Sequence, residues 1–168
     1  MCFLDTDKDS GLDATEWGRG VDLLKAMTAK RHGIAAVQPS GTGDITGSAI
    51  RWTESRNVPE VPAPLYYRDR IYTVMNGSIV TCLDAGSGKV VYRGRISAPG
   101  PYYASPIAAD GKVIIASGDG IMTVIQAGDK LTILSQTDIG EPIFATPAPI
   151  GTGLYVRSAN TMWAFGTR

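Results

Sequence analysis

Acidic side chains recur close to the start of the chain, within one stretch of twelve residues. Oxygen atoms at positions 1, 3, 5, 7, 9 and 12 of such a stretch are what a hard cation with six to eight oxygen ligands requires. An apolar residue at the eighth position, here Leu12, usually anchors a loop of this kind. We therefore expect a calcium site. Its expected ligands are Asp5, Asp7, Asp9, Gly11 through its carbonyl, Asp13 and Glu16.

Two departures from the ideal loop predict weak binding. Ser10 occupies the sixth position, where glycine adopts a positive φ that costs a serine about 1 kcal/mol. Residues 1–4 alone precede the loop, so no entering helix is expected. A structural ion is therefore the expectation, rather than a calcium sensor. The alternative is an acidic turn that caps the following helix and binds no ion.

Other residue types that carry catalysis are sparse. His32 is the only histidine, and it stands beside basic residues and Gly33, as at a helix C-terminus. Cys2 and Cys82 lie far apart and match no zinc or redox spacing, so we expect Cys82 to be a buried strand residue. We therefore expect no enzyme active site in this chain.

Charge and hydropathy exclude two further classes of partner. The 16 basic and 16 acidic side chains cancel, which gives no electrostatic footprint for nucleic acid. No apolar run approaches the ~20 residues of a membrane-spanning helix, and the N-terminus lacks the features of a signal peptide.

A helix is predicted over residues 14–31, directly after the acidic loop. Trp17, Val21, Leu24 and Thr28 fall on one side of it, which is the 3.6-residue period of an amphipathic helix. Two glycines weaken it by roughly 1 kcal/mol each relative to alanine, so we expect it to need packing.

Beyond residue 60 the chain repeats itself. The recurring segments are Ala63-Pro64-Leu65, Ser105-Pro106-Ile107 and Thr146-Pro147-Ala148, at intervals of 42 and 41 residues. Asn-Gly and Asp-Gly pairs, which are strong hairpin signals, separate short β-prone runs inside each unit. In the first unit these runs are residues 65–67, 70–75, 78–83 and 90–93, and in the second they are 106–109, 112–117, 121–126 and 131–136.

Units of about forty residues with four strands each are typical of propeller blades, which stack on their neighbours. Two partial units accompany the complete ones. Residues 34–37 and 49–53 precede them, and residues 143–148, 153–157 and 161–165 form a third unit with three strands. We therefore predict a mainly β fold: a partial β-propeller with two complete four-stranded blades and two partial blades, plus the N-terminal loop and helix. A β-sandwich is the alternative.

One turn motif carries a family resemblance. Residues 83–92, Leu-Asp-Ala-Gly-Ser-Gly-Lys-Val-Val-Tyr, resemble the repeat of pyrroloquinoline-quinone-like (PQQ-like) bacterial propellers, in which an Asp-Ala-x-x-Gly-Lys turn precedes a docking aromatic residue. Tyr92 stands at that position, and Trp52 stands at the equivalent position of the preceding unit. The second unit keeps residues 127–130 of the turn but has lost the aromatic.

The segments before each Pro motif resemble a narrower group, bacterial propeller proteins with EF-hands inserted in a blade. This resemblance implies an EF-hand-type insertion at residues 1–32 and a partial PQQ-like propeller at residues 33–168. It also implies that N-terminal blades, a first EF-hand and an export signal are missing from this chain, and that the parent is periplasmic or extracellular.

The function expected from these features is a non-enzymatic, calcium-binding propeller that acts as an envelope scaffold or interaction module. Its partners would be proteins, or further copies joined through open propeller edges. The alternative is a fragment of a quinoprotein oxidoreductase. Such dehydrogenases bind quinone at the centre of a complete ring, often beside a pair of adjacent cysteines; this sequence has no such pair, and PQQ is not expected. Two interpretations of Tyr66, Tyr67, Tyr102 and Tyr103 stay open: they line a central channel, or they pack between blades.

Overall fold

The structure is a computed structural model of the chain. It describes residues 7, 9, 11, 13–29, 33–39, 41–45 and 48–166, and for residues 23–29 the backbone alone. The chain divides into two compact units, residues 1–32 and 33–168. No helix in the described ranges is both long and apolar enough to cross a membrane.

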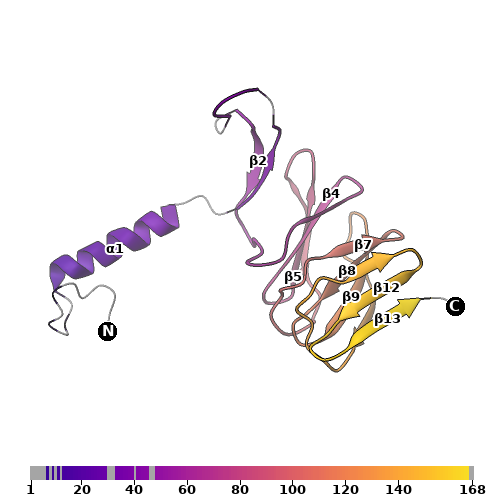
Figure 1. The fold of residues 1–168 in the computed structure, drawn as a ribbon. Helices are drawn as coiled ribbons and strands as arrows, with labels where there is room; N and C mark the ends of the chain where they lie inside the picture. The colour runs from indigo at the N-terminus through magenta and orange to yellow at the C-terminus, as the bar shows by residue number, and fades with distance from the viewer. Residues whose placement is uncertain are drawn as a thin grey trace. The chain divides into compact units, whose positions relative to one another are not determined.

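Within its described residues, the first unit contains one helix, α1 (Ala14–Ala29) (Figure 1). It starts where the sequence predicts, because Oδ1 of Asp13 accepts hydrogen bonds from the backbone N–H groups of Thr15 and Glu16, both at 2.7 Å. The predicted end at residue 31 and the capping role of His32 lie outside the described residues. Trp17 is 62% exposed on the helix surface.

The second unit consists of antiparallel sheets in which sequential strands pair (Figure 1). Blade 1 contains β3 (Leu65–Tyr67), β4 (Arg70–Met75), β5 (Ile79–Asp84) and β6 (Val90–Arg95). Blade 2 contains β7 (Ile107–Ala109), β8 (Lys112–Ala116), β9 (Ile121–Gln126) and β10 (Ile133–Asp138). Blade 3 contains β11 (Ala148–Ile150), β12 (Gly153–Arg157) and β13 (Met162–Gly166), and a hairpin of β1 (Ile34–Val37) and β2 (Ile50–Glu54) precedes blade 1. The predicted architecture of two complete and two partial blades is confirmed.

The turns show how the sequence specifies each meander. Arg68 and Asp69 join β3 to β4 with φ values of 51° and 57°, as a two-residue turn with left-handed conformation at both positions requires. Asp110 and Gly111 repeat this geometry between β7 and β8, with φ of 48° and 73°. The Asn-Gly pair of blade 1 differs from the prediction, because Gly77 and Ser78 take the positive φ values and β5 begins one residue later.

The predicted strand at residues 143–148 is wrong. The first strand of each blade begins directly after the proline of its repeat, so in blade 3 it covers Ala148–Ile150. The proline of each repeat lacks the N–H that a ladder requires and stands directly before its strand, whereas Pro149 is tolerated inside β11 because β11 is an edge strand of its sheet. Ile143 is apolar because it is fully buried against blade 2, not because it belongs to a strand.

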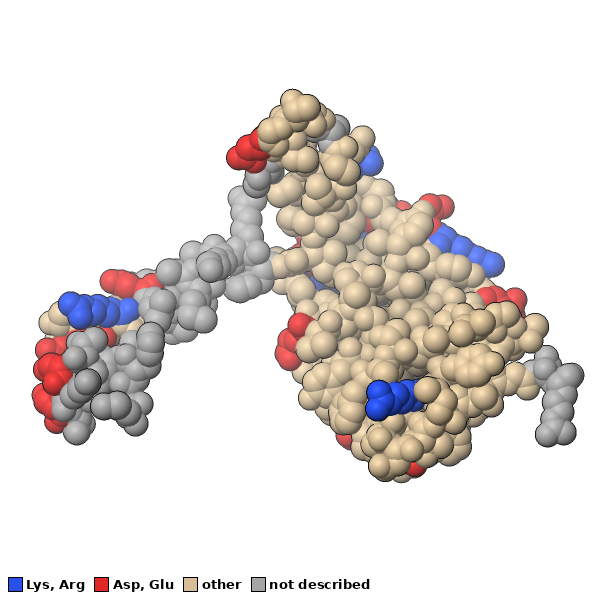
Figure 2. Space-filling view, in the orientation of Figure 1, with Lys and Arg blue, Asp and Glu red and all other residues tan. Residues whose placement is uncertain are grey.

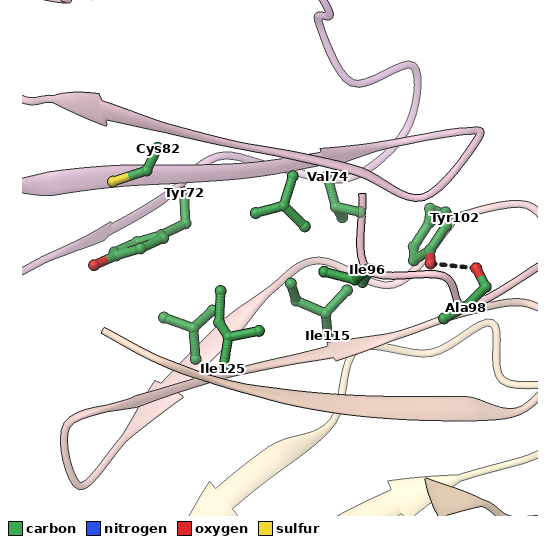
Figure 3. Packing of buried hydrophobic residues seen from close by; sticks show 10 residues of the cluster. Tyr72, Val74, Cys82, Ile96, Ala98, Tyr102, Ile115 and Ile125 are labelled. Atoms are coloured by element: carbon green, nitrogen blue, oxygen red, sulfur yellow. Dashed lines mark hydrogen bonds between the residues drawn. The ribbon is translucent and has the colours of Figure 1, made fainter. Parts of the chain in front are cut away.

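Two hydrophobic clusters lie between successive blades. Between blades 1 and 2, side chains from β4 and β5 meet side chains from β8 and β9, and Tyr102 closes the cluster with its hydroxyl donating to the Ala98 carbonyl at 2.7 Å (Figure 3). The buried members are Tyr72, Val74, Val80, Cys82, Ile96, Ala98, Tyr102, Val113, Ile115 and Ile125. Between blades 2 and 3, the buried members are Ala104, Ile114, Ala116, Met122, Ile143 and Val156. Alternating strand residues thus give each blade two apolar faces, one for each neighbour.

Candidate functional site

The acidic loop places five of the six expected calcium ligands within the described residues; Asp5 lies outside them. Glu16 is only 4% exposed, and its carboxylate faces the loop. Its Oε1 accepts from the Asp7 N–H at 3.3 Å and its Oε2 from the Asp13 N–H at 3.4 Å. A carboxylate at the twelfth position that reaches back across the loop is in the place where a bidentate ligand closes a calcium site.

The remaining hydrogen bonds curl the loop backbone. Asp9 donates its N–H to Oδ1 of Asp7 at 3.2 Å, and Gly11 donates to Oδ1 of Asp9 at 2.7 Å. Among the described residues, no group of three or more His, Cys, Asp or Glu side chains is arranged to hold a metal. Because Asp13 also caps α1, the alternative of an acidic capping turn has support too. The calcium site stays a prediction.

In the second unit, Trp52 of the hairpin docks on the turn between β5 and β6. Its indole N–H donates to the Ala85 carbonyl at 3.0 Å. Its ring lies so close to Gly88, with φ of +71°, that a Cβ there would stand 2.5 Å from Cδ2 of the indole. The turn between β5 and β6 is therefore a docking site for the aromatic residue of the preceding strand pair.

Asp84 stabilises the conformation of the same turn. Asp84 Oδ1 accepts from the backbone N–H of Ser87 at 2.9 Å and from the Ser87 hydroxyl at 2.7 Å. These hydrogen bonds, with the positive charge of Arg70, lower the pKa of the Asp84 carboxyl below its usual value. An aspartate suits this position of the motif because its ionised carboxylate accepts hydrogen bonds from N–H and O–H groups in the turn, which have no acceptor on a neighbouring strand.

An ion pair joins blades 1 and 2 at this end of the strands. The Arg70 guanidinium lies 3.1 Å from Asp84 in its own blade and 2.7 Å from Asp129 in the next. Sequence reasoning missed this pair, because the two partners in different blades are 59 residues apart. The recurrence of an Asp in the turn at residues 127–130 was the signal that could have found it.

Beneath Arg70, the interface between blades 1 and 2 holds a thiol and two phenols. Cys82 is buried as predicted, and burial raises its pKa to about 11. Burial also raises the pKa of Tyr92, with a smaller contribution from nearby Cys82. The Tyr72 hydroxyl accepts the Gly128 N–H at 2.9 Å. The buried Tyr92 hydroxyl finds no hydrogen-bond partner among the residues that the structure describes. These neutral groups fill the interface and carry no charge for chemistry near pH 7.

Two of the four tyrosines fit the interpretation that they pack between blades; a role of the other two in a central channel stays a prediction. Tyr102 is 1% exposed, and Tyr67 packs against the same cluster while its hydroxyl accepts the Gly111 N–H of blade 2 at 3.0 Å. These two pack between blades. Tyr66 and Tyr103 are 61% and 42% exposed. They therefore contribute to the molecular surface.

Tyr103 belongs to a row of exposed apolar side chains, one at each blade entry. Val61, Tyr103 and Phe144 each stand four residues before the first strand of their blade and are 61%, 42% and 56% exposed. The rings of Tyr103 and Phe144 meet edge to face, with centroids 5.4 Å apart. We call these three residues the entry row.

Hydroxyl groups link the same entry segments. Ser105 accepts the Ala63 N–H at 2.9 Å, and Thr146 accepts the Ser105 N–H at 3.0 Å. These hydrogen bonds span 42 and 41 residues, the period of the repeat. The Ser/Thr-Pro motif that revealed the repeat is therefore also the inter-blade contact.

Stacked antiparallel meanders with these repeat contacts define a partial β-propeller. No family model matches the sequence, and no curated protein matches it either. BamB from Moraxella catarrhalis superposes with a TM-score of 0.59 and 23% identity, over 70% of this chain and 37% of that one. A quinohemoprotein alcohol dehydrogenase from Pseudomonas putida HK5 superposes with a TM-score of 0.53 and 16% identity, over 63% of this chain and 19% of that one.

This chain therefore spans less than two thirds of either structure's length. At these identities the similarity shows the fold, since propellers host many unrelated functions.

Proposed function

We propose that this chain is part of an envelope β-propeller that works by binding other proteins and carries a calcium-stabilised loop. The entry row is the observation that supports it most directly. Exposed apolar side chains scattered singly are ordinary, but the touching rings of Tyr103 and Phe144 form a continuous exposed apolar patch, which is a feature of interaction surfaces. Aromatic anchors are enriched where proteins bind proteins.

Charge agrees with this proposal. On the face of the molecule in Figure 2, acidic and basic side chains of the second unit are interspersed in a surface that is mostly uncharged. A surface of this kind is better suited to contacts with other proteins than to binding an anionic polymer such as nucleic acid. The similarity to BamB and to a quinohemoprotein dehydrogenase, both bacterial, supports placing the parent in the cell envelope.

Capture of partners from a bacterial envelope fraction tests the interaction. Phe144→Glu puts a charge into the entry row, whereas Val90→Glu changes a residue that is 41% exposed on β6. A partner retained by the wild type and by Val90→Glu, but lost with Phe144→Glu, supports the proposal. Equal capture by all three proteins, with unchanged circular dichroism, contradicts it.

Calcium titration by calorimetry tests the loop. Glu16→Gln should weaken binding by on the order of tenfold, because it removes the ligand that contributes two oxygens. Glu60→Gln is the matched control in the other unit. Trp17, next to Glu16 and exposed, offers a fluorescence signal for the same titration. Identical isotherms for wild type and Glu16→Gln would remove the calcium site and leave a helix-capping turn.

The second candidate function is part of a quinoprotein oxidoreductase, which the similarity to the Pseudomonas enzyme favours. The two candidates differ in one assay. A full-length parent that binds PQQ and reduces a dye with an alcohol would support the oxidoreductase. Stable folding with calcium alone, and no dye reduction, would support the binding module.

A further inference from the structure

Each of blades 1 to 3 is preceded by a residue that stands four positions before the proline of its repeat. We call these residues, Glu60, Tyr102 and Ile143, the entry residues. Tyr102 and Ile143 are 1% and 0% exposed, whereas Glu60 lies on the surface. A member of the entry row follows each entry residue directly, so the contacts of an entry residue set the position of its exposed neighbour.

One asparagine side chain joins the entry residues of blades 1 and 2. Asn76 lies in the turn between β4 and β5, and its Oδ1 accepts the Tyr102 N–H at 2.8 Å. Its Nδ2 donates to Oε2 of Glu60, also at 2.8 Å. An amide offers an acceptor and a donor at once, which a carboxylate does not. Asn76 therefore holds the residues next to Val61 and Tyr103, two members of the entry row.

The equivalent turns of blades 2 and 3 hold their own entry segments through the main chain. Gly118 and Ala159 stand 42 and then 41 positions after Asn76. The Gly118 N–H donates to the Pro101 carbonyl at 2.6 Å, and the Ala159 N–H donates to the Pro142 carbonyl at 3.0 Å. Among the blades in the described ranges, blade 1 is thus the one whose turn makes this contact with a side-chain amide.

Asn76 is also the one asparagine, of three in the sequence, that a glycine follows. Because glycine has no Cβ, its nitrogen can closely approach the carboxamide carbon of the residue before it. Gly77 is exposed and Asn76 is half-buried, so water reaches the pair. The side chain that links two entry residues is therefore also the amide most open to attack by its own backbone.

We propose that Asn76 is a site of spontaneous deamidation, and that the reaction detaches Glu60 and displaces Val61 from the entry row. The Gly77 nitrogen attacks Cγ of Asn76 and forms a bond to it. The Cγ–Nδ2 bond breaks, and Nδ2 leaves as ammonia with the proton that Gly77 gives up. Water then opens the cyclic imide to aspartate or isoaspartate. One water is consumed, one ammonia is released, and nothing is oxidised or reduced.

The products differ from asparagine mainly in their contact with Glu60. In aspartate, a carboxylate oxygen would face Oε2 of Glu60 at the 2.8 Å where a donor stands in asparagine. Two carboxylates at this separation repel each other, and Glu60, being exposed, turns into water instead. The other oxygen of the aspartate still accepts the Tyr102 N–H. Isoaspartate adds a methylene to the main chain of the turn and misplaces both contacts, so both products lose the link to Glu60.

The same two hydrogen bonds slow the reaction in the folded chain. Cγ of Asn76 must leave the position in which Glu60 and Tyr102 hold it before the Gly77 nitrogen can attack, because attack requires aligned atoms in contact. Deamidation therefore follows local opening of these contacts. This reaction does not depend on the proposed function, whereas its effect on partners rests on the entry row being a binding surface.

Peptide mapping by mass spectrometry of the full chain, incubated at neutral pH, measures the reaction. Deamidation changes the mass of a peptide, whereas isomerisation at an Asp-Gly pair does not. Asn57 and Asn160 are the internal references, since no glycine follows them. We expect Asn76 to react at least about tenfold faster than either. It should also react at least about tenfold faster in the urea-unfolded chain than in the folded chain. Equal rates at the three asparagines, or equal rates at Asn76 in the folded and unfolded chain, overturn the inference.

A matched pair of variants tests the contact that slows the reaction. Glu60→Ala removes the acceptor of the Asn76 amide and should speed deamidation in the folded chain about fivefold. Glu60→Gln keeps an oxygen acceptor and should react at the wild-type rate. Equal rates in the two variants would show that Glu60 does not restrain the amide.

Asn76→Asp reproduces one product and isolates its effect. Amide hydrogen exchange at Ala63, whose N–H binds Ser105, reports on the entry segment of blade 1. We expect exchange about fivefold faster in Asn76→Asp. Adding Glu60→Gln should restore the wild-type rate, because the new amide donates to the new carboxylate. Unchanged exchange in Asn76→Asp, or no recovery with Glu60→Gln, contradicts the detachment of Glu60.

Partner capture separates this inference from the proposed function. A partner that binds the wild type, is lost with Asn76→Asp and returns when Glu60→Gln is added supports both. A partner lost with Phe144→Glu but fully retained by Asn76→Asp overturns the effect of deamidation on the entry row. If the wild type captures no partner through the entry row, the proposed function fails, and the deamidation rates and Ala63 exchange still decide the inference.

Discussion

Contact between Trp52 and Gly88 allows a double-mutant cycle with a computable outcome. Gly88→Ala introduces a Cβ in a left-handed conformation, at a cost of about 1 kcal/mol. The same Cβ would lie 2.5 Å from the indole ring, and such overpacking costs roughly 1–3 kcal/mol more. The total expected for the single substitution is therefore about 2–4 kcal/mol of hairpin docking free energy.

Trp52→Ala removes the ring and the hydrogen bond to Ala85. That bond contributes about 1 kcal/mol, and a half-buried indole adds roughly 2 kcal/mol relative to alanine. In the Trp52→Ala background, the new Cβ of Gly88→Ala meets no indole ring. The substitution should then cost only the strain of a left-handed backbone conformation, about 1 kcal/mol. The cycle should therefore show a coupling of roughly 1–3 kcal/mol.

Native-state amide exchange measures the opening of the hairpin directly. Amides of β1 and β2 report docking, and amides of the buried strand β9 serve as the internal control. Trp52→Phe, which keeps an aromatic ring but loses the donor, should show a cost of about 1 kcal/mol. If the two substitutions are additive within about 0.5 kcal/mol, the ring does not rest on Gly88 and the docking argument is refuted.

Three further predictions concern the contacts between blades. Ser105→Ala should lower the free energy of urea unfolding by about 1 kcal/mol, because it leaves the Ala63 N–H without its acceptor between blades 1 and 2. Ser105→Thr keeps a hydroxyl and should restore the stability. Equal stability of the two variants would contradict the role of these hydroxyl groups. Arg70→Ala should lower the stability measured by urea unfolding only slightly, and by less in high salt, since its ion pairs are partly exposed. A loss of stability that high salt leaves unchanged would contradict this prediction. In a Cys2→Ser background, Cys82 should react with a thiol reagent at pH 8 at least roughly 100-fold more slowly in the folded than in the unfolded chain, because its pKa of about 11 lowers the thiolate fraction. The same raised pKa stabilises the folded state below pH 9, and this contribution to stability should fade as pH rises from 9 towards 11. Rapid labelling of Cys82 at pH 8 would contradict the slow reaction and show that the interface between blades 1 and 2 opens.

Local patterns predicted most of the strands. Asp110-Gly111 marks a hairpin because both residues tolerate positive φ, and the turn forms where expected. The same approach failed at Ile143, where an apolar run looked like a strand but serves as an entry residue. Burial against a neighbouring blade and burial within a sheet both select apolar side chains, so the residue type alone could not separate them.

The candidate calcium loop shows a similar division. The spacing of its carboxylates and the cap at Asp13 can be read from consecutive residues. The burial of Glu16 could not, since it depends on how the loop folds back over its last carboxylate.

By itself the sequence determined the repeat, its turns and the order of strands in each blade, because these follow from φ preferences and proline positions within a few residues. Only the tertiary structure decided the contacts between blades. The bond from Ala63 to Ser105 spans 42 residues, and the Arg70–Asp129 pair spans 59. Such partners meet only after whole sheets have stacked, and the geometry of stacking is set by side-chain packing across the faces rather than by any local preference.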